Sequence, residues 1–246
     1  MYDFRNKIVV ITGAANGIGA CMAERFLKED AEAVILIDLE KDITEAKAKA
    51  LDPSGERTMA VSCNVADIKS VKKAFESIME RYGRVDIMIN NAGITNDAMA
   101  HKMTPEQFDT VLKVSLYGSY NCISQVIGGM RERGYGRIIS MSSLASRGNI
   151  GQMNYSAAKA ALIGLTSTLA LENAANGITV NCIAPGMIAT DIIKTIPEKV
   201  KEIQYKAIPM KRLGKPEEVA SLAAFISSDE AAYISGQCIR ITGGAF

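Results

Sequence analysis

The sequence predicts a single α/β domain of the doubly wound, Rossmann type, with a seven-stranded parallel sheet flanked by helices. Seven short β-rich runs alternate with stretches of helical apolar spacing, which is the pattern of repeated βαβ units. A glycine-rich turn, TGAANGIG at 12–19, joins the first of these runs to the first helical pattern. No linker or internal repeat interrupts the chain, so one dinucleotide-binding and catalytic domain spanning residues 1–246 is expected.

The expected strands are apolar runs with little polar alternation, which is typical of strands buried on both faces of a parallel sheet. They are predicted over 8–11, 33–37, 58–63, 85–89, 136–141, 178–184 and 238–241. The sixth strand is expected to stop before Pro185, because proline cannot donate a hydrogen bond in a central strand.

Helix boundaries follow from capping residues. Asp67 is expected to cap the helix after the third strand, and Thr104, Pro105 and Gln107 form a capping box that opens one long helix toward Met130. After Asp191 the pattern fits either a surface helix or a segment that closes over a substrate.

Composition excludes several function classes. The apolar fraction is 48% and the formal charge is +1, which offers no argument for a nucleic-acid or membrane partner and favours a small-molecule ligand. No apolar run reaches the roughly 18 residues of a membrane span, so a cytoplasmic protein is expected. With the single histidine His101 in an expected loop, no metal site is predicted. The five cysteines are interpreted as buried free thiols: Cys21, Cys63, Cys122, Cys182 and Cys238.

The glycine-rich turn predicts a pyrophosphate site. Gly13, Gly17 and Gly19 let the backbone approach a phosphate closely, and the first turn of the next helix offers N–H groups and a positive dipole end. The spacing is GxxxGxG, which differs from the more common GxGxxG. A tight turn without a ligand is the alternative.

Asp38 ends the second expected strand, 19 residues after Gly19. A carboxylate at this distance accepts hydrogen bonds from the adenosine ribose hydroxyls and repels a 2′-phosphate, which favours NAD(H) over NADP(H). The alternative is that Asp38 caps the helix that begins near Lys41. Open parallel sheets bind ligands at the carboxyl ends of their strands, so Asn64, Asn91 and Gly93 are also expected to line the cofactor.

Tyr155 and Lys159 lie four residues apart in NYSAAKAALIGL, so a helix places them on one face, about one turn apart. An ammonium near a phenol favours the phenolate, which moves the pKa of the tyrosine toward working pH. The pair is therefore a candidate for general acid/base chemistry, although such spacing also occurs by chance. Small residues on the same helix, such as Ala157 and Ala161, suit either core packing or a subunit interface.

Taken together, TGAANGIG at 12–19, NNAG at 90–93, YSAAK at 155–159 and PG at 185–186 resemble the short-chain dehydrogenase/reductase family over essentially the whole chain. The resemblance implies that Tyr155 exchanges a proton with the substrate oxygen, that Lys159 holds the nicotinamide ribose and lowers the pKa of Tyr155, and that a serine steadies the carbonyl. The expected cofactor-binding residues are Gly13, Asn16, Gly17, Ile18, Gly19, Asp38, Asn64, Val65, Asn91, Ala92, Gly93, Val114, Tyr155, Lys159, Pro185, Gly186, Ile188 and Thr190.

Two positions depart from the family pattern. Counting back the usual spacing from Tyr155 gives Ser142 as the catalytic serine, whereas ungapped alignment of GRIISMSS gives Ser143. We choose Ser143, because a deletion in the following loop is easier to accommodate than a register slip in a buried strand. Ser115 stands where the family usually has an asparagine that helps to place a water linking the catalytic lysine to solvent. Whether Ser115 supports the same proton relay in this chain is an open question.

Within the family, NAGITNDAMAHKMT, GMRERGYGRIISMSS and IPMKRLGKPEEVA look most like β-ketoacyl carrier-protein reductases and acetoacetyl-CoA reductases, which are commonly tetramers that use NADPH. Asp38 departs from that cofactor use. We expect an NAD(H)-dependent homotetramer that interconverts a ketone and a secondary alcohol, with a 3-oxoacyl thioester as the best substrate candidate. A catabolic secondary-alcohol, hydroxysteroid or polyol dehydrogenase and a catalytically silent nucleotide-binding sensor remain as alternatives.

Overall fold

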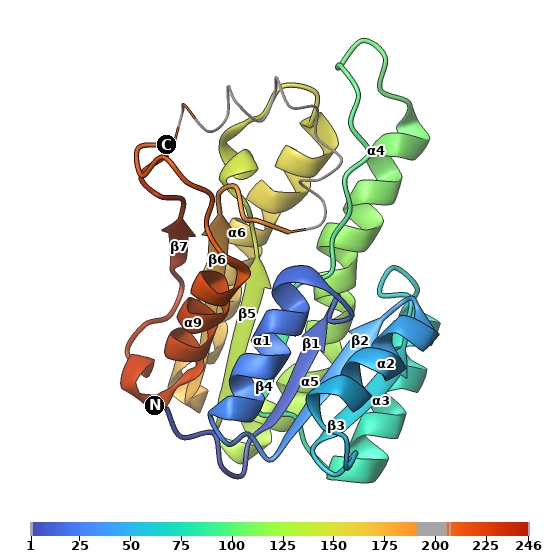
Figure 1. Cartoon of the computed structure of the whole chain (residues 1–246), viewed down its shortest axis with the longest axis vertical. Coiled ribbons are helices and arrows are strands. Elements are labelled where there is room, and N and C mark those ends of the chain that lie inside the picture. The colour runs from blue at the N-terminus through green and yellow to red at the C-terminus, as the bar shows by residue number, and fades with distance from the viewer. Residues whose placement is uncertain (1, 191–205, 207, 246) are drawn as a thin grey trace.

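In the computed structural model, which describes residues 2–190, 206 and 208–245, seven parallel strands form one sheet in the order β3-β2-β1-β4-β5-β6-β7 (Figure 1). This arrangement confirms the predicted fold class. The chain starts in the centre and winds outward to one edge before it crosses to the other. The strands are β1 (Ile8–Thr12), β2 (Ala33–Asp38), β3 (Thr58–Ser62), β4 (Ile87–Asn90), β5 (Gly136–Met141), β6 (Ile178–Pro185) and β7 (Cys238–Ile241).

Helices cover both faces of the sheet. The longer ones are α1 (Gly17–Lys28), α2 (Lys41–Leu51), α3 (Ile68–Tyr82), α4 (Pro105–Leu112), α5 (Gly118–Arg133), α6 (Met153–Asn173) and α9 (Pro216–Ser227). The short ones are η1 (Lys113–Tyr117), η2 (Leu144–Arg147), η3 (Ala174–Asn176) and η4 (Asp229–Ala231). Apolar residues of α1, α2 and α9 pack in one core layer, and those of α3, α5 and α6 pack in the other.

Alternate residues of each strand supply the two layers. In β1, Val9 and Ile11 face α1 and α9, whereas Ile8 and Val10 face α3 and α5, and all four are fully buried. Burying such a side chain contributes roughly 1.5–3 kcal/mol. The sheet is therefore a rigid base for the loops that follow its strands.

The expected helix from Thr104 to Met130 is not continuous. The predicted capping box is present, but a π-helical turn, η1, separates α4 from α5. A π turn inserts one residue into the helical repeat. Beyond it, Gly118 lies so close to Val65 that a Cβ atom would come within 2.7 Å of the valine Cγ2. This contact with the segment that follows β3 is a tertiary effect that the apolar spacing does not reveal.

Other boundaries also differ from expectation. Pro185 is the last residue of β6 and pairs with Ile241, because at the end of a strand its missing N–H is not needed and Gly186 donates to the Ile241 carbonyl instead. Cys63, Cys122 and Cys182 are buried, but Cys21 and Cys238 are partly exposed. The segment from Asp191 to Ile196 lies outside the described residues. Within the described ranges, no helix is long and apolar enough to cross a bilayer.

Candidate active site

The predicted site residues come together at the carboxyl edge of the sheet, which faces the top of Figure 1. The loops after β1, β4, β5 and β6 all leave the sheet there, and α6 begins beside them. Parallel strands bring residues that are far apart in sequence to this one edge.

The glycine-rich loop has a backbone that side chains would not permit. Gly13 and Gly17 have positive φ angles of 64° and 56°, and a Cβ atom on Gly19 would lie 2.1 Å from the Gly13 carbonyl oxygen. Among the described residues, the Asn16 side chain makes no capping bond to α1. The first-turn N–H groups can therefore face an anion, and the loop fits the pyrophosphate of a dinucleotide.

Thr12 and Asn91 tie this loop to the end of β4. Asn91 Nδ2 donates to the Thr12 and Gly13 carbonyls at 3.0 and 2.9 Å, and Thr12 Oγ1 accepts from the N–H groups of Asn91 and Ala92 at 3.0 Å. Asn91 thus supports the loop with its side chain. A role for Thr12 was not predicted from the sequence, although its place at the end of β1 is a usable signal.

Asp38 is positioned by the same loop. One of its carboxylate oxygens accepts from Ala15 N at 3.0 Å, and the other accepts from Leu39 N at 2.8 Å. The N-cap of α2 is Glu40, so the alternative interpretation of Asp38 as a helix cap is wrong. The carboxylate therefore lies against the glycine loop, as recognition of an adenosine ribose requires.

The remaining predicted cofactor residues lie around this edge. Asn64 is exposed after β3, where its Oδ1 accepts from Ala66 N at 3.0 Å. Thr190 lies over the start of α1, with its Cγ2 3.6 Å from the place of a Cβ atom on Gly17. The others are distributed over the same loops: Val65 and Ile188 are buried, Ile18, Ala92, Val114 and Gly186 are half-buried, and Gly93 is exposed.

Ser143, Tyr155 and Lys159 form one cluster. The Ser143 hydroxyl adjoins the Tyr155 phenol and lowers its pKa, and the Lys159 ammonium nitrogen lies 5.4 Å from the centre of the Tyr155 ring. Lys159 is 3% exposed and donates to the Met141 carbonyl at 2.6 Å. A carbonyl oxygen bound near Ser143 and Tyr155 would meet two hydroxyl groups at once.

The electrostatics of this cluster differ from the expectation. Burial lowers the pKa of Lys159 to about 8, because desolvation disfavours its charged form. Burial also raises the pKa of Tyr155; the Ser143 hydrogen bond lowers it and the Asp97 carboxylate raises it further. With a pKa of about 8 Lys159 is still mostly charged at pH 7, but it is not among the groups that shift the pKa of the phenol. The predicted lowering of the Tyr155 pKa is therefore not found in this arrangement.

The two candidate serines differ in their contacts. Ser142 is 3% exposed and donates from Oγ to the Lys159 carbonyl at 2.8 Å, which fastens β5 to α6. Ser143 lies one residue further along, and its Oγ accepts from Ala145 N at 3.1 Å while it also contacts Tyr155. The serine beside the phenol is Ser143.

Behind this cluster lie buried polar atoms without partners among the described residues. They are Ser115 Oγ, both amide atoms of Asn90, and Ser140 Oγ. Asn90 and Ser140 are neighbours in the sheet register. A Cβ atom on Gly93 would lie 3.2 Å from Lys159 Nζ and 3.3 Å from Ser115 Oγ, so the glycine leaves these two atoms facing a common space. Such buried groups usually hydrogen-bond to water.

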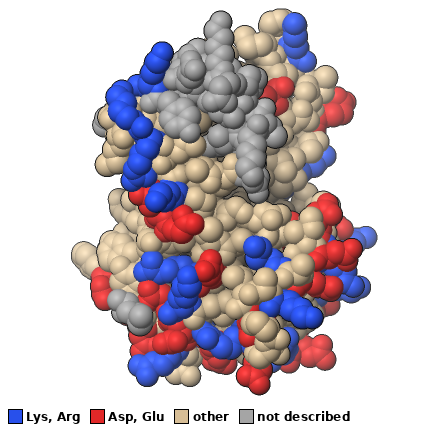
Figure 2. Space-filling view, viewed as in Figure 1, with Lys and Arg blue, Asp and Glu red and all other residues tan. Residues whose placement is uncertain are grey.

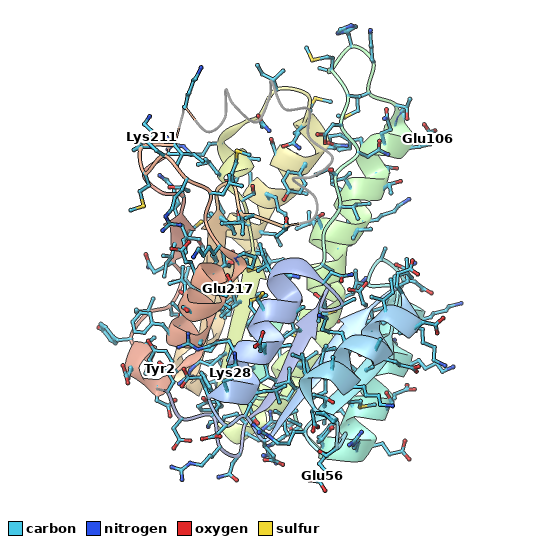
Figure 3. The ribbon with its side chains drawn as sticks, viewed as in Figure 1. Tyr2, Lys28, Glu56, Glu106, Lys211 and Glu217 are labelled. Atoms are coloured by element: carbon cyan, nitrogen blue, oxygen red, sulfur yellow. The ribbon has the colours of Figure 1, made fainter. Side chains whose placement is uncertain are left out.

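Basic side chains flank the same end of the molecule. Figure 2 shows Lys and Arg gathered at the upper left, and Figure 3 places Lys211 there, on the opposite side from Glu106 of α4. Arg212 forms a bidentate ion pair with Glu218 at 2.6 and 2.8 Å, and Lys211 donates to the Lys206 carbonyl. Two further basic residues, Lys102 and Arg147, are also exposed.

Known proteins match this chain along nearly its whole length. A family model described as enoyl-(acyl carrier protein) reductase matches residues 13–245. The 3-oxoacyl-[acyl-carrier-protein] reductase of Thermotoga maritima is 41% identical over 239 residues, which is 97% of each chain. The acetoacetyl-CoA reductase of Cupriavidus necator is 41% identical over 244 residues, again 97% of each. The crystal structure of a 3-oxoacyl-[acyl-carrier protein] reductase from Brucella melitensis has a TM-score of 0.93 at 33% identity, and the match covers 99% of this chain and 92% of that one.

Proposed function

The chain belongs to the short-chain dehydrogenase/reductase family of oxidoreductases, and we propose that it interconverts a 3-oxoacyl thioester and its 3-hydroxyacyl form with NAD(H). The observation that carries this proposal is the cluster of Ser143, Tyr155 and buried Lys159 at the carboxyl edge of the sheet. The substrate class is supported by the named activities of the Thermotoga and Cupriavidus relatives.

The residues act on the substrate oxygen. Tyr155, kept protonated by its burial, donates its phenolic proton to the oxygen of a ketone and takes it back during alcohol oxidation. Ser143 holds the carbonyl by a second hydrogen bond. A nicotinamide cofactor, when bound, supplies or accepts the hydride. Lys159 holds the cofactor ribose, and Ser115 connects the lysine to water on its buried side.

The preference for NAD(H) rests on Asp38. Its carboxylate lies against the glycine loop through Ala15 N, where it would accept hydrogen bonds from ribose hydroxyls. The loop residues Ala15 and Asn16 carry no charge that would offset repulsion of a 2′-phosphate. We expect Asp38→Ala to raise the NADPH/NADH ratio of kcat/KM at least about tenfold, or about 1.4 kcal/mol. Asp42→Ala removes an equal charge from the first turn of α2 and serves as the control. An unchanged ratio in Asp38→Ala removes that residue from this role.

A panel of substrates tests the reaction. Oxidation of NADH should be fast with acetoacetyl-CoA and slow with crotonyl-CoA, which offers a carbon–carbon double bond in place of the ketone. Reduction of NAD by secondary alcohols, hydroxysteroids or polyols, without thioester activity, would favour a catabolic dehydrogenase instead. Tight NAD binding with no turnover of any compound would favour a nucleotide-binding sensor.

We also propose a homotetramer. Large side chains stand exposed on the helices of one face of the sheet: Tyr117 and Tyr120 are 56% and 57% exposed, and Leu171 of α6 is 86% exposed. Exposed Ala157 and Ala161 let a second helix approach α6 closely. Light scattering after size-exclusion chromatography should give four times the chain mass of 26.4 kDa. Ala161→Glu should shift the mass to smaller species, and a monomeric parent protein would contradict the proposal.

A further inference from the structure

Asn154, directly before Tyr155, is fully buried although it lies in the first turn of α6 and carries an amide. Its Nδ2 donates to the carbonyls of Asn96 and Gln107 at 2.9 and 3.0 Å. Its Oδ1 accepts from the backbone N–H of Tyr155 at 2.7 Å. That N–H lies in the first turn of α6, where no helical carbonyl is available. The three hydrogen bonds of this amide thus join the Tyr155 backbone to two other segments of the chain, at Asn96 and at Gln107.

The two carbonyls belong to different segments. Asn96 lies in the loop that follows β4 and the NNAG turn, and Gln107 lies in the first turns of α4, which packs against α6. The Gln107 side chain connects these two segments to each other. Its Nε2 donates to Asn96 Oδ1 at 2.9 Å, and its Oε1 accepts from Thr104 N at 3.0 Å. One buried amide therefore joins α6 to both segments.

Two further hydrogen bonds connect the same loop to the residues just before α6. Ala98 N donates to the Gly151 carbonyl at 2.9 Å, and Gln152 Nε2 donates to Asp97 Oδ2 at 2.9 Å. Asp97 is also the carboxylate that raises the pKa of Tyr155. The position of the 94–103 loop thus affects both the geometry and the charge around the phenol.

We infer that Asn154 is a positioning residue, which fixes Tyr155 relative to Ser143 and couples the phenol to the 94–103 loop and α4. This inference rests on the proposed function, in which Tyr155 exchanges the proton. Hydrogen bonds of a buried amide are costly to leave unmade, so the bonds of Asn154 keep α6 in one position relative to the 94–103 loop and α4. A small misplacement of a proton donor reduces turnover strongly.

Asn154→Ala and Asn154→Ser test this role. Serine keeps an oxygen for the Tyr155 N–H but loses the amide nitrogen that bonds the Asn96 and Gln107 carbonyls. This variant provides the test if the alanine variant does not fold. The matched control is Asn181→Ala in β6: Asn181 is 1% exposed, donates to the Ile234 carbonyl at 2.7 Å and accepts from Gln237 N at 3.0 Å. The two sites have similar burial and bonds, but only one adjoins Tyr155.

Three quantities are measured: the melting temperature, kcat and KM for 3-hydroxybutyryl-CoA oxidation, and the tyrosinate absorbance titration of each variant minus its Tyr155→Phe counterpart. We expect both Asn154 variants to lower kcat about 10- to 100-fold with a smaller change in KM, and to shift the Tyr155 titration. Asn181→Ala should lower the melting temperature to a similar extent and leave kcat and the titration unchanged.

Two results would overturn the inference. An Asn154→Ala protein with a lower melting temperature but unchanged kcat and titration has lost only structural support. An Asn154→Ser protein with full activity shows that the coupling to Asn96 and Gln107 is dispensable. The titration needs no substrate, so a parent protein inactive on every thioester refutes the proposed function and still leaves the role of Asn154 decidable.

Discussion

The glycine-rich loop and the catalytic cluster lie at the same edge of the sheet, but their polar groups are held in opposite ways. Around the loop, the side chains of Thr12, Asn91 and Asp38 are all bonded to backbone groups. In the cluster, Lys159 is buried with a lowered pKa, and Ser115 Oγ has no partner within the described part of the chain. The side chains that support the loop have all their hydrogen-bond partners within the protein, whereas the Ser115 hydroxyl of the second region does not, among the described residues.

The difference between the two regions indicates that the catalytic cluster, and not the glycine-rich loop, lowers the stability of the folded state. Backbone groups and glycines can build a phosphate site without burying charge, because the helix terminus supplies the donors. Proton exchange needs a titratable group in a desolvated place, and such a group destabilises the folded state. Substitutions in the loop should therefore reduce stability, and those in the cluster should reduce turnover while they spare or increase stability.

The largest effect is expected from Tyr155→Phe. Without the phenolic proton, kcat should fall about 1000-fold, which corresponds to about 4 kcal/mol in the transition state. The melting temperature and NADH affinity should stay close to those of the parent protein. Steady-state kinetics with acetoacetyl-CoA and fluorescence titration with NADH provide the measurements. A kcat within tenfold of the parent value would mean that another group exchanges the proton.

Gly19→Ala should damage the loop region. The added Cβ atom would lie 2.1 Å from the Gly13 carbonyl oxygen and 2.8 Å from Asn91 Nδ2, so the backbone must shift at a cost of about 3 kcal/mol. Urea unfolding measures this cost. Gly128→Ala in α5 is the control, because no atom lies within 4 Å of its Cβ position and the change should stabilise the helix by up to about 1 kcal/mol. Equal stability of the two variants would contradict the tight packing of the loop.

Ser142 and Ser143, which directly follow β5, should differ in what their substitution reduces: stability for Ser142 and turnover for Ser143. Ser143→Ala should lower kcat about 100-fold, or about 2.7 kcal/mol, because it removes a hydrogen bond to the substrate carbonyl. Ser142→Ala should lower the free energy of unfolding by about 1 kcal/mol, since the Lys159 carbonyl loses its buried donor, with kcat near that of the parent. The reverse pattern in kinetics and urea unfolding would assign the catalytic role to Ser142.

Lys159→Met should be stabilising at neutral pH although it abolishes turnover. The pKa of Lys159 is about 8 in the folded protein, against an ordinary lysine value of 10.5, so the unfolded chain binds the proton more tightly. The free-energy cost of burying the charged lysine is complete below about pH 8, declines as the pH rises, and is gone above about pH 10.5. Removing the buried charge should stabilise the folded state by about 3 kcal/mol. The Met141 carbonyl, which loses its hydrogen-bond donor, should offset about 1–2 kcal/mol of this gain. Urea unfolding should show a net gain near pH 7 that shrinks by about pH 9.5; a gain independent of pH would refute the cause.

The smallest effect is expected from Ser115. Ser115→Ala removes a buried hydroxyl that has no partner among the described residues, so the free energy of unfolding should change by less than about 1 kcal/mol, toward greater stability. Ser115→Asn should be tolerated, with turnover near that of the parent. A collapse of turnover in the asparagine variant would indicate a different proton path.

Much of the fold was predictable because its signals are local. Alternation of apolar runs with helical spacing predicted all seven strands and the helices between most of them. The capping box at Thr104 and the N-cap residue Asp67 predicted where two helices begin. The glycine loop, Asp38 and the pair Tyr155 and Lys159 were likewise visible, because each needs particular residue types at a spacing set by one turn or one helix.

Other features depended on contacts between distant segments. The π turn at Ser115 adjoins a glycine packed on Val65, the rise in the Tyr155 pKa follows from burial, and the bonds of Asn154 join α6 to a loop about 58 positions earlier. The sequence alone determined which groups are present and at which end of the sheet they gather. Only the tertiary structure decided which of them are desolvated and which are paired, because solvent exclusion and hydrogen-bond partners come from neighbours that are remote along the chain.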